Sequence, residues 1–251
     1  MIFFNKYLST SLKEAKIKEE KTTKEEALKK VNNFEKVEFQ TEDGVKIIGH
    51  FYQAKESKYA GILLHMMPAI KESYSELAKR LQDAGYSVLA IDFRGHGESI
   101  NSVKGVLNYK NFTDKEHQEY IYDVKAASEY LKKRGFPIEN QFLIGASIGA
   151  NIALQFLSLN SEIKAVVLIS PGLNYRGIKI EDFLKKEMDS KILVITGIKD
   201  LQSASSLDLF KNVTPSSTLI TLDSDAHGTD LFEIFPDLVD KIIVFLREKL
   251  I

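Results

Sequence analysis

The sequence predicts an α/β fold with a mostly parallel sheet of eight strands, an N-terminal antiparallel hairpin and helices on both faces. Short apolar runs alternate with segments of helical periodicity, as in sheets whose strands are buried on both sides. The first two strands are instead separated by Asp43-Gly44, a strong hairpin signal. The chain has 251 residues, of which 44% are hydrophobic, enough for one large core.

The elements follow in order after the hairpin of residues 36–52. Continuous apolar runs predict strands at residues 60–65, 86–92, 141–145, 165–170, 192–196 and 217–222. Helical spacing predicts helices at residues 72–85, 117–135, 148–159 and 236–250. Gly85 is a typical helix stop and Pro236 a typical helix start. This alternation gives the parallel part of the sheet its covering helices.

Residues 1–33 differ in composition from the remainder of the chain. They contain eight lysines and five glutamates with only a thin apolar stripe. We expect a solvated helix or a frayed extension there, with a membrane-surface or partner-binding role as the alternative. Residues 34–251 are expected to form a single catalytic domain.

Charge and composition exclude several classes of protein. The formal net charge is −1, so no basic field attracts nucleic acid, and the absence of cysteine excludes disulfides and a thiol nucleophile. No apolar run is long enough to span a membrane, and residues 1–4 are too short for a signal-peptide core. We expect a cytoplasmic monomer or small homo-oligomer, or an extracytoplasmic protein if a signal was removed before residue 1.

The stretch FLIGASIGANIAL places Ser147 between two glycines where an apolar run meets a helical pattern. One interpretation is an ordinary strand-to-helix turn with a serine cap. The other is a nucleophile elbow, in which a tight turn exposes the serine hydroxyl and the glycines prevent collisions. The second interpretation requires an acid and a histidine later in the chain.

Both partners follow late strands of the predicted sheet. Asp200 comes after the strand at 192–196, and His227 after the strand at 217–222. Loops at the carboxyl ends of parallel strands meet at one edge, so convergence with Ser147 is expected. A serine hydroxyl needs a base, a histidine can take and return its proton, and a carboxylate orients the imidazole.

These motifs, together with YSVLAIDFRGHGES before the elbow, make residues 36–251 resemble the α/β-hydrolase family. The resemblance implies Ser147 as nucleophile, Asp200 as acid and His227 as base. Three further carboxylates near the histidine are expected to shape its loop: Asp223, Asp225 and Asp230. The other four histidines are scattered without metal-ligand spacing, so no metal or other cofactor is expected: His50, His65, His96 and His117.

The resemblance also implies an oxyanion hole made by two backbone N–H groups. One belongs to Ile148, directly after the nucleophile, and the other, by alignment with the family's His-Gly-x motif, to Met67. Met66 stands where many relatives have glycine, which leaves the conformation of this loop open. His65 is expected to fix the loop, and three residues of DFRGHGES to support the site from behind it: Asp92, Arg94 and His96.

The connection between the strands ending near residue 170 and starting near residue 192 is too short for a cap domain. It can hold a loop and one short helix, while residues 100–114 could roof the site in part. We expect an open, shallow pocket whose apolar lining alternatively packs in the core: Met66, Met67, Ile148, Leu173 and Tyr175. Such a pocket suits a short or aromatic acyl ester.

The leading hypothesis is a carboxylesterase that acts on a small ester through an acyl-enzyme. Thioesterase, lipase, acyl-peptidase and acyltransferase chemistry would use the same three residues. Serine at the elbow argues against dehalogenase and epoxide hydrolase relatives, which use aspartate, and against the cysteine-dependent dienelactone hydrolases. A hypothesis of another class is a ligand-binding module of this fold without turnover.

Overall fold

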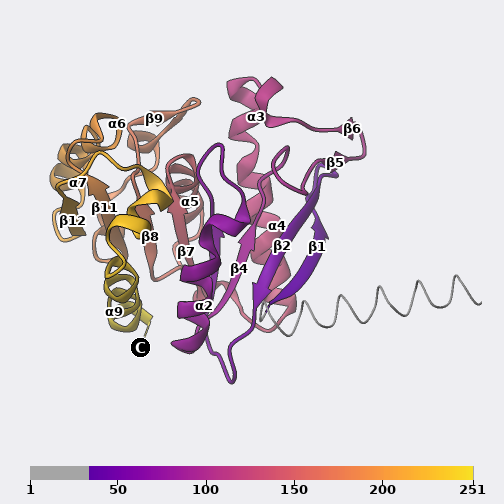
Figure 1. The fold of residues 1–251 in the computed structure, drawn as a ribbon, viewed down its shortest axis with the longest axis horizontal. Helices are drawn as coiled ribbons and strands as arrows, with labels where there is room; N and C mark the ends of the chain where they lie inside the picture. Colours follow the sequence, from indigo (N-terminus) through magenta and orange to yellow (C-terminus); the bar gives the residue numbers. More distant parts are fainter. Residues whose placement is uncertain (1–33, 251) are drawn as a thin grey trace, which may run out of the picture. The chain divides into compact units, whose positions relative to one another are not determined.

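The computed structural model describes residues 34–250, so the expectation for residues 1–33 lies outside the described part. The central sheet has eight strands, drawn in Figure 1. They are β1 (Glu35–Gln40), β2 (Lys46–Tyr52), β3 (Ala60–Leu64), β4 (Ser87–Ile91), β7 (Gln141–Ala146), β8 (Val166–Ile169), β11 (Ile192–Gly197) and β12 (Thr218–Leu222). Their order across the sheet is β1-β2-β4-β3-β7-β8-β11-β12.

The sheet has the mixed topology that the sequence predicts. The chain reverses over residues 41–45, where the Thr41 hydroxyl accepts the Val45 N–H at 2.8 Å, and so joins β1 and β2 as a hairpin. β2 pairs antiparallel with β4, and the pairs from β4 through β3, β7, β8 and β11 to β12 are all parallel. The prediction of fold class is therefore confirmed.

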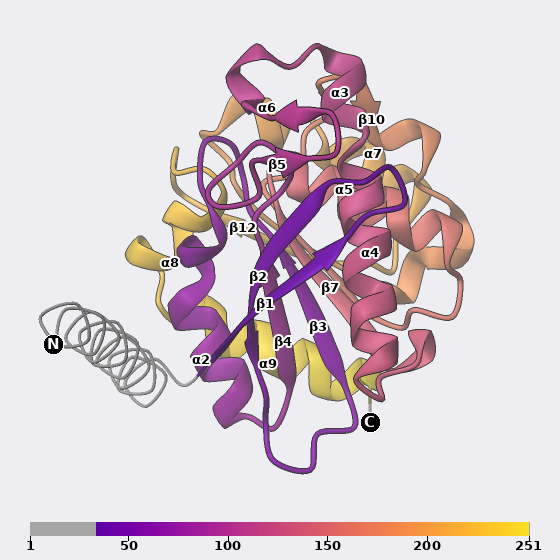
Figure 2. The ribbon, with the colours of Figure 1, turned by 90° about the vertical axis from the view of Figure 1, so that its right-hand side faces the viewer.

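Four long helices cover the sheet. They are α2 (Ser75–Asp83), α4 (Tyr120–Lys133), α5 (Ile148–Leu159) and α9 (Leu238–Leu250). α2 packs against α9, α4 packs against α5, and Figure 2 shows α2 and α4 on opposite sides of the sheet. In α2, Leu77, Ala78 and Leu81 are buried, which is the apolar stripe that predicted the helix.

The connecting segments hold more structure than predicted. Residues 100–114 contain the small hairpin β5–β6 and the 3-10 turn η2, and the predicted helix at 117–135 is divided at Glu119 into α3 and α4. Instead of a loop and one short helix, the connection from β8 to β11 contains the hairpin β9–β10 and two 3-10 turns. The elements added here are β5 (Asn101–Ser102), β6 (Gly105–Val106), η2 (Tyr109–Asn111), α3 (Asp114–Gln118), β9 (Asn174–Tyr175), β10 (Ile178–Lys179), η4 (Ile180–Asp182) and η5 (Lys186–Lys191).

Short helices also flank the late strands, where the sequence predicted none. They are α6 (Leu201–Ala204), α7 (Leu207–Val213) and α8 (Leu231–Ile234), with the 3-10 turns η1 (Lys71–Tyr74), η3 (Ile138–Asn140) and η6 (Gly228–Asp230) elsewhere. Each is too short to show a clear periodicity. Within residues 34–250, no helix combines the length and the apolar character that crossing a bilayer requires.

Strand register brings the ends of the parallel strands to one edge. Leu64 at the end of β3 pairs with Gly145, and Ala146 at the end of β7 pairs with Ile169 of β8. Gly197 at the end of β11 pairs with Leu222 at the end of β12. The loops that follow these strands therefore share the edge where ligands bind in such sheets.

Candidate active site

Ser147 lies in the sharp turn between β7 and α5. Its backbone has φ 56° and ψ −122°, a region that residues with a side chain rarely adopt. The Ser147 N–H donates to the Ile169 carbonyl of the neighbouring strand β8 at 2.8 Å, which ties the turn to the sheet. Strain of this kind costs on the order of 1–3 kcal/mol and is characteristic of functional sites.

The two glycines of the motif are needed because backbone segments meet there. A Cβ on Gly145 would lie 2.2 Å from the carbonyl oxygen of Gly149. A Cβ on Gly149 would lie 2.3 Å from the carbonyl oxygen of Leu64, at the end of β3. Helix α5 therefore begins in contact with both β7 and the loop after β3, and no larger residue fits at either position.

Asp200 and His227 meet at the same edge, although they come from different loops. The Nδ1 atom of His227 lies 2.7 Å from Oδ2 of Asp200. The Asp200 side chain is 9% exposed and that of His227 is 30% exposed, so the carboxylate is sheltered while the imidazole reaches the surface. Asp223, a nearby rival, instead pairs with Lys199 at 2.8 Å and is largely exposed.

Ser203 is a third member of this cluster that the sequence did not indicate. It is buried in α6, and its hydroxyl donates to Oδ2 of Asp200 at 2.6 Å. The same oxygen of Ser203 lies 3.4 Å from Nδ1 of His227. Residues three apart share a helix face, which is the one signal that could have identified Ser203 after Asp200.

Ser170 anchors the loop that carries His227 through a hydrogen bond. It directly follows strand β8 with φ 50°, is fully buried, and accepts the Gly228 N–H at 2.9 Å on its hydroxyl oxygen. Gly228 itself has φ 58°, and a Cβ there would lie 2.5 Å from the Met66 sulfur. The loop that carries His227 is thus packed between the ends of β8 and β3. No motif of the sequence marks Ser170.

Tyr175, predicted as a pocket residue, is turned inward toward the serine. It is 8% exposed, and its hydroxyl lies 3.4 Å from both Oγ of Ser203 and the carbonyl oxygen of Ser170. Burial raises the pKa of the Tyr175 hydroxyl, and interactions with the Ser203 and Ser147 side chains oppose this rise. The ring stands edge-on to His227 with the ring centres 6.2 Å apart.

The serine and the histidine are therefore at the same site without a direct bond. Within residues 34–250, Ser147 and His227 share no hydrogen bond, and the Tyr175 hydroxyl is one polar neighbour of the Ser147 side chain. Active-site hydrogen bonds are often long or absent until a substrate is bound. Leu173 is another predicted pocket residue. It precedes Tyr175 by two positions, and it is 44% exposed.

Neither backbone N–H group that the resemblance implies for an oxyanion hole has a hydrogen-bond partner among residues 34–250. Ile148 is the first residue of α5, so its N–H has no carbonyl partner within the helix. The Ile148 side chain is 1% exposed and belongs to the core, so only its backbone N–H can contribute to the site. Across residues 34–250, the N–H of Met67 also lacks a hydrogen-bond partner.

His65 fixes the loop that carries Met66 and Met67. Its Nδ1–H donates to the Met66 carbonyl at 2.8 Å, and its Nε2 accepts the Phe93 N–H at 3.0 Å. Complete burial lowers the pKa of His65 to about 4, so the imidazole stays neutral at pH 7. These contacts agree with a supporting role.

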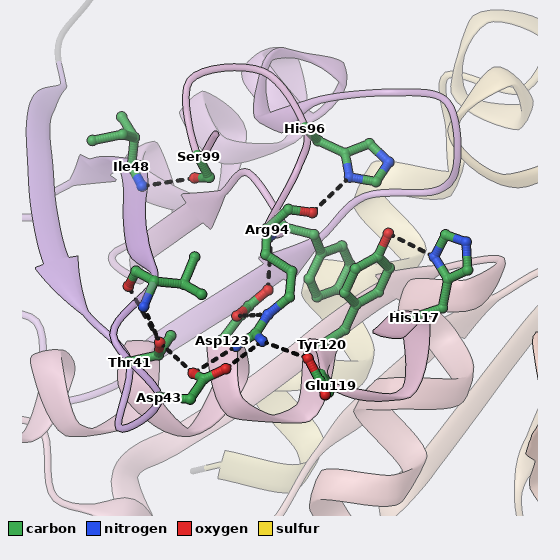
Figure 3. A network of polar contacts seen from close by, with 12 residues as sticks. Thr41, Asp43, Ile48, Arg94, His96, Ser99, His117, Glu119, Tyr120 and Asp123 are labelled. Atoms are coloured by element: carbon green, nitrogen blue, oxygen red, sulfur yellow. Dashed lines mark hydrogen bonds and ion pairs between the residues drawn. The ribbon is translucent and has the colours of Figure 1, made fainter. Parts of the chain in front are cut away.

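Arg94 joins the loop after β4 to two distant segments. Figure 3 shows its side chain among Asp43 of the first hairpin, Glu119 and Asp123. Its Nε donates to Asp123 at 2.8 Å, and its terminal nitrogens donate to Asp43 at 2.6 and 3.0 Å. Burial by itself lowers the pKa of Arg94, but the Asp123 charge and these hydrogen bonds raise it above its usual value.

Asp92, in the same loop, accepts hydrogen bonds from the backbone N–H and the ammonium group of Lys71, both at 2.8 Å. Among the described residues, no group of three or more His, Asp or Glu side chains is arranged to hold a metal ion.

Comparison with known proteins gives a family match for the central part of the chain. A family profile described as "Serine aminopeptidase, S33" matches residues 56–210. An uncharacterised protein of Rickettsia prowazekii is 31% identical over 96 residues, which are 38% of this chain and 36% of that protein. The thiohydrolase aneE of Aspergillus aculeatus is 22% identical over 214 residues, 81% of this chain and 63% of that protein. The chain thus spans less than two thirds of either curated relative.

Solved structures agree on the architecture. The esterase Pf2001 of Pyrococcus furiosus superposes with a TM-score of 0.68 at 25% identity, over 86% of this chain and 93% of that chain.

Proposed function

Because the chain belongs to the serine aminopeptidase S33 family of α/β hydrolases, we propose that it cleaves carboxylic esters of small substrates through Ser147, His227 and Asp200. Family membership supports a hydrolase, and the esterase among the similar structures motivates the choice of esters. The observation that carries the proposal is the 2.7 Å bond between His227 and Asp200, at the sheet edge where Ser147 occupies its strained turn.

The proposed reaction has two steps. In the first, Oγ of Ser147 attacks the ester carbonyl while its proton passes to Nε2 of His227, which returns it to the departing alcohol. In the second, His227 takes a proton from water, the hydroxide attacks the acyl-enzyme, and the acid leaves as Ser147 regains its proton. Asp200 keeps Nδ1 protonated and stabilises the imidazolium of both steps.

Charge on the carbonyl oxygen has to be stabilised as each tetrahedral intermediate forms. The N–H groups of Ile148 and Met67 are the proposed donors, since neither is used inside the fold. His65 holds the Met67 loop through two hydrogen bonds, so this donor needs no particular side chain at position 67. A hole of this kind contributes about 10²–10³-fold to the rate for each donor.

The test combines covalent labelling with ester hydrolysis. We expect a fluorophosphonate to form a single adduct on Ser147 by mass spectrometry, and p-nitrophenyl acetate and butyrate to be hydrolysed. Both should be lost in Ser147→Ala. Asp200→Asn should lower kcat by about 10³–10⁴-fold because the imidazole tautomer is no longer enforced. Asp223→Asn is the matched control, because Asp223 pairs with Lys199 and should leave kcat unchanged.

Two results would overturn the proposal. Folded protein without adduct and without turnover would indicate a ligand-binding module. Equal losses in Asp200→Asn and Asp223→Asn would remove Asp200 from its proposed role.

Thioester hydrolysis is a second candidate, because the relative from Aspergillus aculeatus that aligns over most of this chain carries the name thiohydrolase. The same residues would serve, with a thiol as leaving group. Comparing kcat/KM for S-butyryl-N-acetylcysteamine and p-nitrophenyl butyrate separates the two preferences. Amino-acid p-nitroanilides test the peptidase activity that the family description names.

A further inference from the structure

A cavity of about 350 Å³ adjoins the loop that carries Met67. Three segments far apart in the sequence line it: the loop after β3, the region of η2 and α3, and the turn of the hairpin β9–β10. The residues that matter for its chemistry are Met67, Tyr109, Lys110, Phe112, His117 and Arg176. Since Met67 carries one of the proposed oxyanion donors, the cavity lies next to the proposed reaction centre.

The cavity is positively charged. No carboxylate lines it, and in the part of the chain that the structure describes Lys110 makes no ion pair. Arg176 is 3.6 Å from Asp114, but both side chains are more than half exposed, so this pair is weak. Burial, together with the charge of Arg176, lowers the pKa of His117, so the imidazole is neutral at pH 7.

Arg176 is held in place by an unusual turn. Arg176 and Gly177 form the two-residue connection of the hairpin, with φ values of 55° and 80°. Hairpins of this type favour Asn-Gly, and an arginine at positive φ costs on the order of 1 kcal/mol. The turn is anchored by Gln118, whose side chain donates to the Arg176 carbonyl at 3.1 Å, and by the Asn174 side chain, which accepts the Gly177 N–H at 2.8 Å.

The hairpin contributes to both the reaction centre and the cavity. The buried Tyr175 hydroxyl lies 3.4 Å from Oγ of Ser203, beside His227, while the next residue, Arg176, lines the cavity. Two aromatic rings flank the cations in the same cavity. Tyr109 is stacked on His96 with ring centres 3.8 Å apart, and Phe112 stands edge-on to His117. A fixed apolar wall beside two cations suits a group that is anionic at one end and apolar along its length.

We propose that the cavity binds an anionic group of the substrate, a carboxylate or a phosphate, beyond the bond that is cleaved. The inference rests on the proposed function, because it takes Met67 as part of the oxyanion hole. The anion pairs with Lys110 and Arg176, and the segment that connects it to the scissile carbonyl lies against Tyr109 and Phe112. The preferred substrates are therefore esters or thioesters with a negative charge, in either the acyl group or the leaving group.

Two matched substrate pairs distinguish these sources of charge. Mono-p-nitrophenyl adipate against p-nitrophenyl hexanoate tests a carboxylate on the acyl side. Butyryl-coenzyme A against S-butyryl-N-acetylcysteamine tests phosphate on the leaving side. The quantity measured is the ratio of kcat/KM for the anionic substrate to kcat/KM for its neutral partner. In one of the two pairs, we expect the anionic substrate to be preferred, so that this ratio is above unity.

The variants are Lys110→Gln, Arg176→Asn and their combination, with asparagine chosen because it tolerates positive φ. We expect the ratio to fall about tenfold for each charge removed, the equivalent of about 1.4 kcal/mol. Added salt should lower the ratio in the wild type and have less effect in the double variant. The matched control is Lys104→Gln, an exposed lysine in the turn of β5–β6 outside the cavity, which should leave the ratio unchanged.

The two proposals fail in different ways. Hydrolysis of the neutral substrates with ratios at or below one, or ratios that the double variant and Lys104→Gln change equally, would overturn the anion site and leave the esterase proposal standing. Absence of turnover for all four substrates, together with absence of a fluorophosphonate adduct on Ser147, would overturn both.

Discussion

The hydroxyl oxygen of Ser170 accepts a hydrogen bond from the backbone N–H of Gly228 at 2.9 Å. Ser170 directly follows β8, a central strand of the sheet, and Gly228 directly follows His227. The proposed base is therefore positioned by the sheet itself and by its bond to Asp200.

Ser170→Ala and Ser170→Gly separate this role from backbone strain. Both remove the acceptor, so we expect kcat for p-nitrophenyl butyrate to fall by about tenfold as the His227 loop loosens. Glycine also relieves the positive φ of 50°, so its thermal midpoint should not fall below that of the alanine variant. If both variants keep full kcat, the hydrogen bond has no part in positioning His227.

Ser203→Ala tests the hydroxyl that shares an oxygen of Asp200 with His227. Its removal leaves the carboxylate with one hydrogen bond fewer, and we expect kcat to fall by about threefold to tenfold with little change in KM. The matched control is Ser205→Ala, because that hydroxyl bonds the Gln202 carbonyl at the surface of the same segment. Equal kinetics of the two variants would show that Ser203 only packs.

Tyr175→Phe removes one polar neighbour of the Ser147 side chain. If the tyrosine competes with His227 for that hydroxyl in the free enzyme, its loss should raise the rate of fluorophosphonate labelling by about threefold, a change of about 0.7 kcal/mol. Labelling rates at several reagent concentrations measure this directly. A slower rate would instead indicate that the hydroxyl supports the reaction.

The burial of His96 should make the stability of the fold depend on pH. Burial, with a smaller effect of the neighbouring His65, lowers the pKa of His96 to about 3, whereas the unfolded chain titrates near 6.5. Between these values the unfolded state binds a proton that the folded state does not, so stability falls as the pH falls. This contribution is fully present above pH 6.5 and is lost progressively toward pH 3.

His96→Phe should reduce that loss. The phenylalanine ring can keep the stacking on Tyr109, and within the described residues Nε2 of His96 has no hydrogen-bond partner. The substitution gives up only the 3.3 Å contact between Nδ1 and the Arg94 carbonyl. Urea unfolding at pH 7.5 and pH 4.5 should show a smaller difference in the free energy of unfolding for the variant than for the wild type. Equal differences would place the acid sensitivity in other groups.

The sequence was most informative where one residue type has one physical reason. Gly145 and Gly149 are spaced as they are because two backbones meet there, and the apolar runs that became β3, β7 and β8 have no solvent-exposed face to interrupt them. The motif therefore placed Ser147 correctly between β7 and α5.

Other parts could not be predicted because they depend on long-range contacts. Nothing in the sequence marks Ser170, whose hydroxyl matters only through its partner in the loop after β12. Ser203 has only its spacing of three residues from Asp200, a weak signal because serine is common. The hairpin β9–β10 has Arg-Gly rather than Asn-Gly at its turn and is held by Gln118 from α3. The contact between Tyr175 and Ser147 depends on that hairpin, so it could not be predicted from the sequence either.

The order in which the chain supplies the site has a consequence for its biosynthesis. Ser147 belongs to a central strand, whereas Asp200 and His227 follow β11 and β12, which are added last to one side of the sheet. A nascent chain that has folded only through β8 would carry Ser147 without its proposed acid and base. The proposed hydrolase activity is therefore expected to be absent on the ribosome until β11 and β12 have folded. Proteolytic removal of β12 should abolish the activity again while most of the sheet stays folded.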